Sequence, residues 1–209
     1  MKRVVITGIG AISPIGNNAN TITESLMNGK SGLAINQGYI DNNMRCHVSG
    51  SLSTNLDVID RKMLRFMSET SAYSYLAAQD AINDSGLKEN DIQNEFTGVV
   101  VGSGTGSSKE IQRVIDVTRE RGMKRIGPYS VTKTMSNTTS ASISTFLKTQ
   151  GVSYSIASAC TTSLHCISHG CDLIKEKDRV ESVKSIYIAG AETNNLKNVS
   201  VEFPLNKLV

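Results

Sequence analysis

Cys160 is the residue of this chain whose type and surroundings best suit covalent chemistry. It lies in the segment SYSIASACTTSLHCISHGCDLIK, where an apolar run typical of a strand gives way to a helical pattern. Amide N–H groups at the start of a helix carry partial positive charge, so they stabilise a thiolate. They can also bind the oxygen of an acyl group on the sulfur, as half of an oxyanion hole. The sequence therefore predicts a nucleophilic cysteine, with small neighbours such as Ala159 and Thr161 leaving room for a substrate.

A purely structural role for Cys160 is the alternative. Free cysteine often behaves as a small core hydrophobe. Steps of four and three residues place one set of side chains on a single helix face: Cys160, Leu164, Ile167, Cys171 and Ile174. We expect Cys166 and Cys171 to be packing residues and Cys46 to be a loop thiol. Spacing alone leaves both roles of Cys160 open.

The three histidines do not supply an evident base for this cysteine. At about 100° per residue, His165 and His169 lie about 140° and 180° around a helix from Cys160, so neither reaches its sulfur. His47 is a lone histidine in a loop-rich region. A metal cluster of His165, Cys166 and His169 would lack a fourth ligand nearby. We therefore expect neither a metal nor another cofactor.

Two glycine stretches suggest a nucleotide site but do not fit its pattern. In VVITGIGAISPIG the motif G-x-G-x-x-G would require glycine where Ser13 stands, and in GSGTG (102–106) it would require glycine where Ser107 stands. An NAD(P)-binding oxidoreductase remains an alternative. Tight turns that bring the backbone close to an active centre are the simpler explanation.

Basic residues gather in two places. We expect a helix over 60–86, and its first turns carry Arg61, Lys62 and Arg65. Cations at the start of a helix oppose the helix dipole. A second group lies at the next helix end and loop: Arg119, Arg121, Lys124 and Arg125. Each group is either a solvated face or a docking site for an acidic macromolecule, whose encounter rate would depend on salt.

Strands and helices alternate along the chain. We expect strands over 3–7, 98–104, 152–158 and 185–190, helices over about 19–28, 60–86, 107–121, 134–149 and 160–175, and loops with a short hairpin within 36–58. The charged loop KEKDRVES separates the last helix from the last strand. This alternation predicts an α/β layered fold with a mainly parallel sheet, in one domain spanning 1–209.

The composition argues against several classes of protein. The 22 Lys and Arg against 19 Asp and Glu leave a formal charge of +3, too little to suggest a nucleic acid as the main partner. No apolar run approaches the roughly 18 to 20 residues that cross a bilayer, so we expect no membrane association. Four cysteines without a C-x-x-C pair or a secreted framework predict free thiols and a cytoplasmic location.

Four segments in order resemble one family: MKRVVITGIGAISPIGNN, IDRKMLRFMSETSAY, GPYSVTKTMSNTTSASIS and YSIASACTTSLHCI. Over about residues 1–190 the chain is similar to the amino-terminal half of type I β-ketoacyl-acyl-carrier-protein synthases. The resemblance implies a thiolase-like fold, half of a five-layered αβαβα core, in a homodimer. It implies that Cys160 takes an acyl group from carrier protein and that malonyl-carrier protein is decarboxylated and attacks the thioester, as in fatty acid biosynthesis.

The resemblance also assigns binding residues. Met135 matches a residue that lines the acyl pocket at the dimer interface. The positions that dock the acyl- or malonyl-loaded carrier are Arg61, Lys62, Arg65, Arg121 and Lys124. The family's decarboxylating histidines and lysine, and a second oxyanion donor, belong to its carboxyl-terminal half. We therefore expect the 209-residue chain alone to be incomplete or inactive, with an exposed apolar face, and to complete no condensation unless a separately encoded carboxyl-terminal half joins it. The alternative is a non-catalytic dimer partner or inactive remnant.

Overall fold

The computed structural model describes residues 3–176, 185–191 and 199–204. The chain divides into two units, residues 3–171 and residues 172–209. The α-helices of the first unit are α1 Ala19–Met27, α2 Gln37–Asp41, α3 Arg61–Leu64, α4 Glu69–Ser85, α5 Glu89–Ile92, α6 Ser108–Arg121, α7 Ser130–Thr134, α8 Thr138–Leu147 and α9 Thr162–Glu176, and α9 continues into the second unit. Its strands are β1 Leu33–Ile35, β2 Val48–Gly50, β3 Val99–Val100 and β4 Ser153–Tyr154. Its short 3-10 helices are η1 Leu56–Val58, η2 Met123–Arg125 and η3 Ala159–Thr161. The second unit also contains β5 Ser185–Ala191 and β6 Val199–Pro204.

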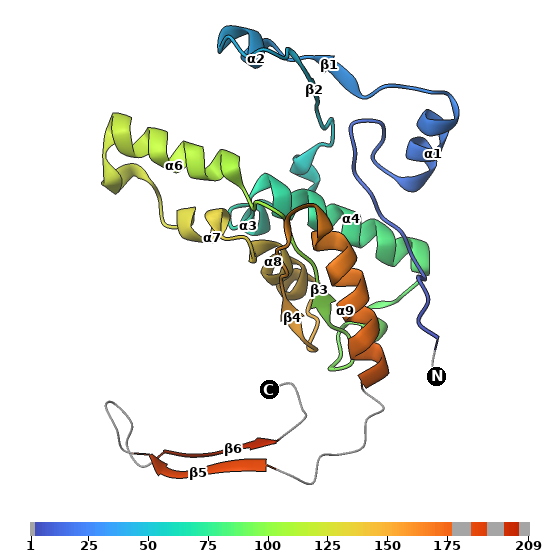
Figure 1. Ribbon diagram of the computed structural model, residues 1–209, viewed down its shortest axis with the longest axis vertical. Coiled ribbons are helices and arrows are strands. Elements are labelled where there is room, and N and C mark those ends of the chain that lie inside the picture. Colours follow the sequence, from blue (N-terminus) through green and yellow to red (C-terminus); the bar gives the residue numbers. More distant parts are fainter. Residues whose placement is uncertain (1–2, 177–184, 192–198, 205–209) are drawn as a thin grey trace. The chain divides into compact units, whose positions relative to one another are not determined.

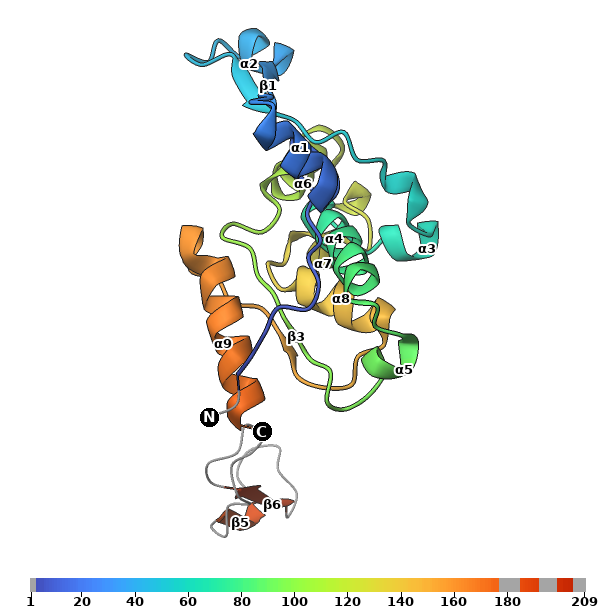
Figure 2. The same ribbon diagram turned by 90° about the vertical axis from the view of Figure 1, so that its right-hand side faces the viewer.

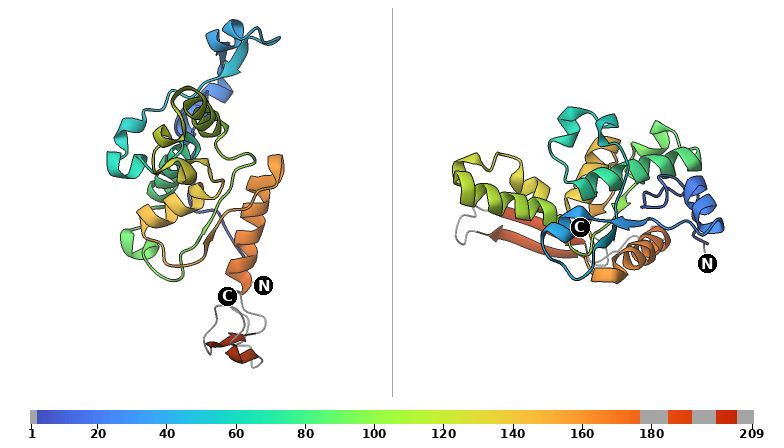
Figure 3. Two further views of the ribbon diagram at one scale, coloured as in Figure 1. Left: turned by 90° about the vertical axis from the view of Figure 1, so that its left-hand side faces the viewer. Right: turned by 90° about the horizontal axis from the view of Figure 1, so that it is seen from above.

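Layers of helix and strand organise the first unit. Strands β3 and β4 pair in parallel, with Val99 opposite Ser153 and Val100 opposite Tyr154. Helix α8 packs against both strands and against α4, whereas α9 lies on the other side of the strands (Figures 1 and 2). The left-hand view of Figure 3 shows the same order, and the ring of His169 on α9 lies 5.6 Å from that of Tyr154. The predicted α/β layering with parallel strands is confirmed.

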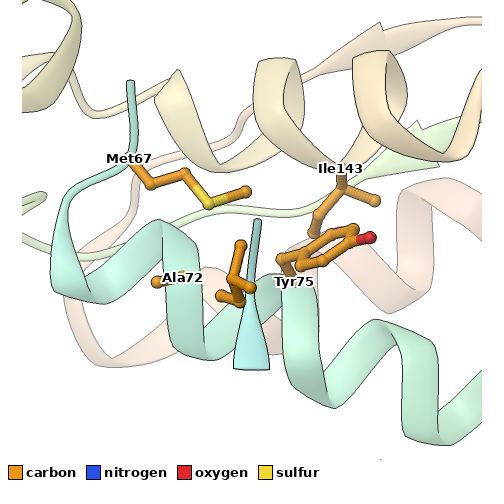
Figure 4. Close-up of a cluster of buried hydrophobic side chains, with 5 residues drawn as sticks. Met67, Ala72, Tyr75 and Ile143 are labelled. Carbon is orange, nitrogen blue, oxygen red and sulfur yellow. The ribbon is translucent and has the colours of Figure 1, made fainter. Parts of the chain in front are cut away.

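The buried core lies between α4 and α8. Met67, Ala72, Tyr75 and Ile143 meet there (Figure 4), and Ile59 completes the cluster. Small hydroxyl residues on α8, Thr139, Ser140 and Ser142, are buried as well, and the Ser140 hydroxyl accepts a hydrogen bond from the Ser155 hydroxyl, just after β4, at 2.9 Å. Burial raises the pKa of the Tyr75 hydroxyl, which accepts a hydrogen bond from Gln79 Nε2 at 2.9 Å.

The single helix expected over 60–86 is wrong: α3 and α4 are separate helices. Asp60 caps α3 by accepting a hydrogen bond from the Lys62 amide, and Gly86 ends α4 with φ of 72°, as the sequence predicted. Between them, Ser68 adopts an extended conformation and its side chain accepts from the Ser71 amide. Ser68 therefore opens a second helix, and the helical spacing of apolar residues does not register this break because Met67 stays in the core.

The strand expected over 3–7 is also wrong, because these residues form no regular element. The chain instead lies along α4, where the Ile9 amide donates to Asp84 at 2.8 Å. A Cβ on Gly10 would stand 1.9 Å from the Ala77 carbonyl oxygen, so this glycine permits the close approach. The role of Gly10 is therefore to let the chain contact α4. Without a strand beside them, the side chains of Val5 and Ile6 are exposed.

The other boundaries agree with the sequence to varying degrees. The helices expected over 19–28 and 107–121 are confirmed as α1 and α6. The one expected over 134–149 is shorter, since α8 begins at Thr138 after a separate α7. The hairpin expected within 36–58 begins earlier, since β1 precedes this range and pairs antiparallel with β2 around α2.

The second unit contains the strand expected over 185–190, as β5, which pairs antiparallel with β6. Most of the loop KEKDRVES lies outside the described residues. None of the helices in the described part of the chain is long and apolar enough to cross a membrane.

We expect Ile143→Ala to lower the free energy of unfolding by about 2 to 5 kcal/mol, because it removes three carbons from the buried cluster and leaves a cavity. The measurement is urea unfolding followed by circular dichroism. Val131→Ala is the control, since Val131 is exposed and its truncation should change the free energy by no more than about 0.5 kcal/mol. Equal losses from the two variants would contradict this core.

Candidate active site

Cys160 lies on an exposed turn that leads into a helix. It is the middle residue of η3 and stands two positions before the first residue of α9. The helix expected from Cys160 therefore starts later, after one turn of 3-10 helix. Cys160 is not a core residue of this chain, because the face it shares with Leu164 and Ile167 is not buried: these two side chains are 65% and 56% exposed. The buried face of α9 carries Thr162 and Cys166.

The remaining cysteines fit the sequence-based expectations. Cys166 is buried, Cys171 is half-buried and Cys46 is exposed, and all four thiols are free.

Hydrogen bonds from Thr162 hold the turn that carries Cys160. The buried hydroxyl of Thr162 accepts from the Ser158 amide at 2.9 Å and donates to the Ala159 carbonyl at 2.8 Å. The Thr161 amide donates to the Ser158 carbonyl at 3.1 Å. Ala159 has a φ of 50°, a left-handed conformation that costs a non-glycine residue free energy. The hydroxyl of Thr162 thus offsets the strain of a sharp strand-to-helix turn.

His165 reaches back to this turn. Its Nδ1 lies 2.7 Å from the Ser158 hydroxyl oxygen, so the first turn of α9 is tied to the residue before Ala159. His169 contacts Tyr154, and His47 is exposed. Among the residues that the structure describes, no three His, Cys, Asp or Glu side chains gather where they could hold a metal ion.

The glycine loop 102–106 passes directly beside the Cys160 turn. A Cβ on Gly102 would meet the Ile156 carbonyl oxygen at 1.8 Å, and one on Gly104 would lie 3.1 Å from the Ala159 carbonyl oxygen. Gly106, with φ of 67°, lies against Ser136, the neighbour of Met135. The loop therefore contacts both the Cys160 turn and the segment of Met135, whose side chain is exposed at the end of α7.

Two contacts connect α4 with the segment that follows the glycine loop: one to Gly106 and one to the first turn of α6. The Thr70 hydroxyl donates to the Gly106 carbonyl at 3.3 Å. Lys109 Nζ lies 2.5 Å from Glu69 Oε1, and this hydrogen bond raises the pKa of the lysine. The first turns of α4 and α6 are thus joined beside the site.

The basic residues named from the sequence are exposed on three elements. Arg61 and Lys62 lie in α3 and Arg65 caps its carboxyl end, where a cation is favourable. Arg121 ends α6 and Lys124 lies in η2. The expectation that the first group opposes the dipole of a long helix does not hold, because α3 is short and separate.

Aromatic contacts join the end of α3 to the start of α7. The guanidinium carbon of Arg65 lies 5.0 Å from the centre of the Phe66 ring and 5.5 Å from that of Tyr129, just before α7. The two ring centres are 4.7 Å apart at 71°, an edge-to-face arrangement. Arg121 lines an open hollow of about 630 Å³ together with Arg113, Val117 and Arg125.

Sequence reasoning missed the residues that position others. Thr162 and His165, four and seven residues after Ser158, form hydrogen bonds with it. Both side chains lie in the first turns of α9 and can therefore reach back to Ser158, which precedes the helix. Phe66 and Tyr129 contact Arg65, and only the adjacency of Arg65 and Phe66 was visible in the sequence.

Comparison with known proteins gives a consistent result. The family model of the beta-ketoacyl synthase N-terminal domain matches residues 1–180. The chain is 48% identical over 177 residues to 3-oxoacyl-[acyl-carrier-protein] synthase 1 of Haemophilus influenzae. The matched part is 84% of this chain and 44% of that relative, so the chain spans less than half the length of this curated relative.

Solved structures have the same fold. A beta-ketoacyl synthase from Burkholderia phymatum superposes with a TM-score of 0.73 at 24% identity, over 92% of this chain and 47% of that one. AntDE, described as a type II PKS ketosynthase in complex with its acyl-carrier protein AntF, superposes with a TM-score of 0.67 at 21% identity, over 90% of this chain and 50% of that one. The thiolase-like ketosynthase fold expected from the sequence is therefore confirmed.

We expect iodoacetamide to modify Cys160 and Cys46 long before Cys166 in the folded chain, because only the first two thiols are exposed. Cys160 should react faster than Cys46, since Cys46 lies in a loop and gains nothing from a helix start. Mass spectrometry of time points identifies each site. Equal labelling of all thiols in urea is the control, and protection of Cys160 as strong as that of Cys166 would contradict its exposed position.

Thr162→Val should lower the free energy of unfolding by about 1 to 3 kcal/mol, because valine keeps the shape of threonine but leaves the Ser158 amide and Ala159 carbonyl without their partner. Thr162→Ser retains the hydroxyl and is the matched control. Urea unfolding of both variants gives the comparison. If valine and serine had the same effect, the hydroxyl would not hold the turn.

Proposed function

Because the chain belongs to the β-ketoacyl synthase family, we propose that Cys160 is the nucleophile of a 3-oxoacyl-[acyl-carrier-protein] synthase of fatty acid biosynthesis. Its sulfur attacks the thioester carbon of an acyl-loaded carrier protein. The new bond joins that carbon to the sulfur of Cys160, and the carrier leaves as a free thiol that takes up the proton.

Condensation follows on the acylated cysteine. Malonyl-loaded carrier protein loses carbon dioxide, and the electron pair left on its α-carbon attacks the acyl carbon. The bond from that carbon to Cys160 breaks and the thiolate is released, while the acyl chain on the carrier is two carbons longer. The proposal assigns the covalent intermediate to this chain.

The exposed position of Cys160 on a held turn carries the proposal. Transfer requires a sulfur that the thioester can reach, and Cys160 is exposed in this chain. The strained turn fixes the backbone from which the sulfur projects. Met135, on the other flank of the glycine loop, is proposed to contact the acyl chain.

An acyl carrier protein is the proposed partner of the basic residues. The solved structures with a fold similar to this chain include a ketosynthase in complex with its acyl-carrier protein. The exposed side chains that we propose to dock an acidic carrier are Arg61, Lys62, Arg65, Arg121 and Lys124. Positive groups on two neighbouring elements would steer an acidic protein to the site.

The decarboxylating residues are proposed to lie outside this sequence, as the family resemblance implies. Exposed apolar side chains, including Val5, Ile6, Leu164 and Ile167, agree with a chain that packs against a further half or forms a homodimer. We propose the reducing cytoplasm as its location because its thiols are free. A non-catalytic dimer partner is the second candidate, since the chain spans less than half of its relative.

Incubation with hexanoyl-loaded acyl carrier protein should add one hexanoyl group to Cys160, detected by intact-mass and peptide mass spectrometry. Cys160→Ser should abolish the transfer from the thioester, whereas Cys46→Ser should leave it unchanged because Cys46 lies in another loop. Absence of transfer to a thiol that iodoacetamide modifies readily would favour the non-catalytic partner.

The isolated 209-residue chain should release no carbon dioxide from malonyl-loaded carrier protein and form no 3-oxoacyl product. Adding the carboxyl-terminal half of the Haemophilus influenzae relative as a separate polypeptide tests whether condensation can be restored. Turnover by the chain alone would refute the assignment of decarboxylation to residues elsewhere.

A further inference from the structure

We propose that Phe66 and Tyr129 are positioning residues for carrier docking, because they hold the guanidinium of Arg65 in a fixed orientation on the protein surface. The inference rests on the proposed docking function and assigns residues that neither the basic pattern nor the comparisons identify. Its observation is the cluster of three side chains formed by Arg65 and the two rings.

The geometry of the cluster suits a cation held by aromatic rings. The guanidinium lies within about 6 Å of both ring centres, the range in which a cation is attracted to the ring face. Both rings are half-buried, whereas Arg65 is exposed. The two rings therefore form a fixed support in the protein, and the guanidinium of Arg65 stays available to a partner.

Holding the side chain lowers the cost of binding. An arginine that is free in solvent loses rotamer freedom when it pairs with a carboxylate, and this loss opposes association. A guanidinium that is already held against two rings loses less. Arg65 should therefore contribute more to docking than a solvated arginine of the same charge.

The cluster also joins the two basic groups into one surface. Tyr129 precedes Ser130, whose hydroxyl accepts a hydrogen bond from Arg113 of α6 at 3.2 Å. Arg113 lines the hollow that Arg121 borders. A chain of contacts thus runs from Arg65 on α3, through Tyr129, to the arginines of α6. We infer that this surface receives acidic side chains of one carrier protein.

Arg61 provides a control in the same group. It lies in α3 like Arg65, but among the described residues no ring contact involves it. If the rings act through Arg65, replacing Tyr129 should lower the contribution of Arg65 and leave that of Arg61 unchanged.

The test is a double-mutant cycle on the affinity of the 209-residue chain for acyl carrier protein that carries no acyl group, so that no transfer to Cys160 contributes heat, measured by calorimetry at low ionic strength. Tyr129→Leu should weaken binding about two- to fivefold, the range expected for an exposed cation–aromatic contact. Tyr129→Phe keeps the ring and should bind like the unmodified chain. In an Arg65→Ala background Tyr129→Leu should have no further effect, whereas with Arg61→Ala the two losses should multiply.

The outcomes separate the inference from the docking function. Equal effects of Tyr129→Leu with and without Arg65 would overturn the positioning role while leaving docking intact. A lack of affinity in the unmodified chain would overturn docking itself and the inference with it. Should Tyr129→Leu fail to fold, nuclear magnetic resonance of the unmodified chain decides. The Nε–H signal of Arg65 should be displaced by ring currents relative to that of Arg61, and an undisplaced signal would overturn the inference.

Discussion

The structure of the site depends on one buried hydroxyl, that of Thr162. It bonds to the amide before Ala159 and to the carbonyl of Ala159 itself, so it spans the residue with the left-handed conformation. Such a conformation persists only where the surroundings determine it. Because α9 starts at Thr162, the same hydroxyl connects the strained turn to a regular helix, and Cys160 lies between the two on an exposed peptide. The exposed position of Cys160 follows from how this turn is held.

The first unit buries few apolar side chains and exposes many others. Its buried cluster is small and lies between α4 and α8, whereas α9 turns polar and small residues inward and exposes Leu164 and Ile167. Helices in water normally bury their apolar face. The reversed orientation of α9 agrees with an element that belongs to a larger core, as expected for a chain that matches less than half of its relative.

The basic surface is built from separate elements whose relation is tertiary. Arg65 is favourable at the carboxyl end of α3, and Arg121 is favourable at the end of α6, so each cation is compatible with its own helix. The Phe66 and Tyr129 rings join the end of α3 to the start of α7, and the hydrogen bond from Arg113 to Ser130 joins α7 to α6. Charge repulsion between the groups is tolerated because the side chains are solvated and an acidic partner would neutralise them.

The sequence by itself determined the features that act over a few residues: the place of Cys160 at a strand-to-helix junction, the caps at Asp60 and Gly86, and the order of motifs that identifies the family. Only the tertiary structure decided that residues 3–7 form no strand, because extended residues need a neighbouring strand to pair with. It also decided that Ser68 divides a helix and that Arg65 meets Tyr129. Periodicity reports which face of an element is apolar, and contacts between residues distant in sequence decide which surface covers that face.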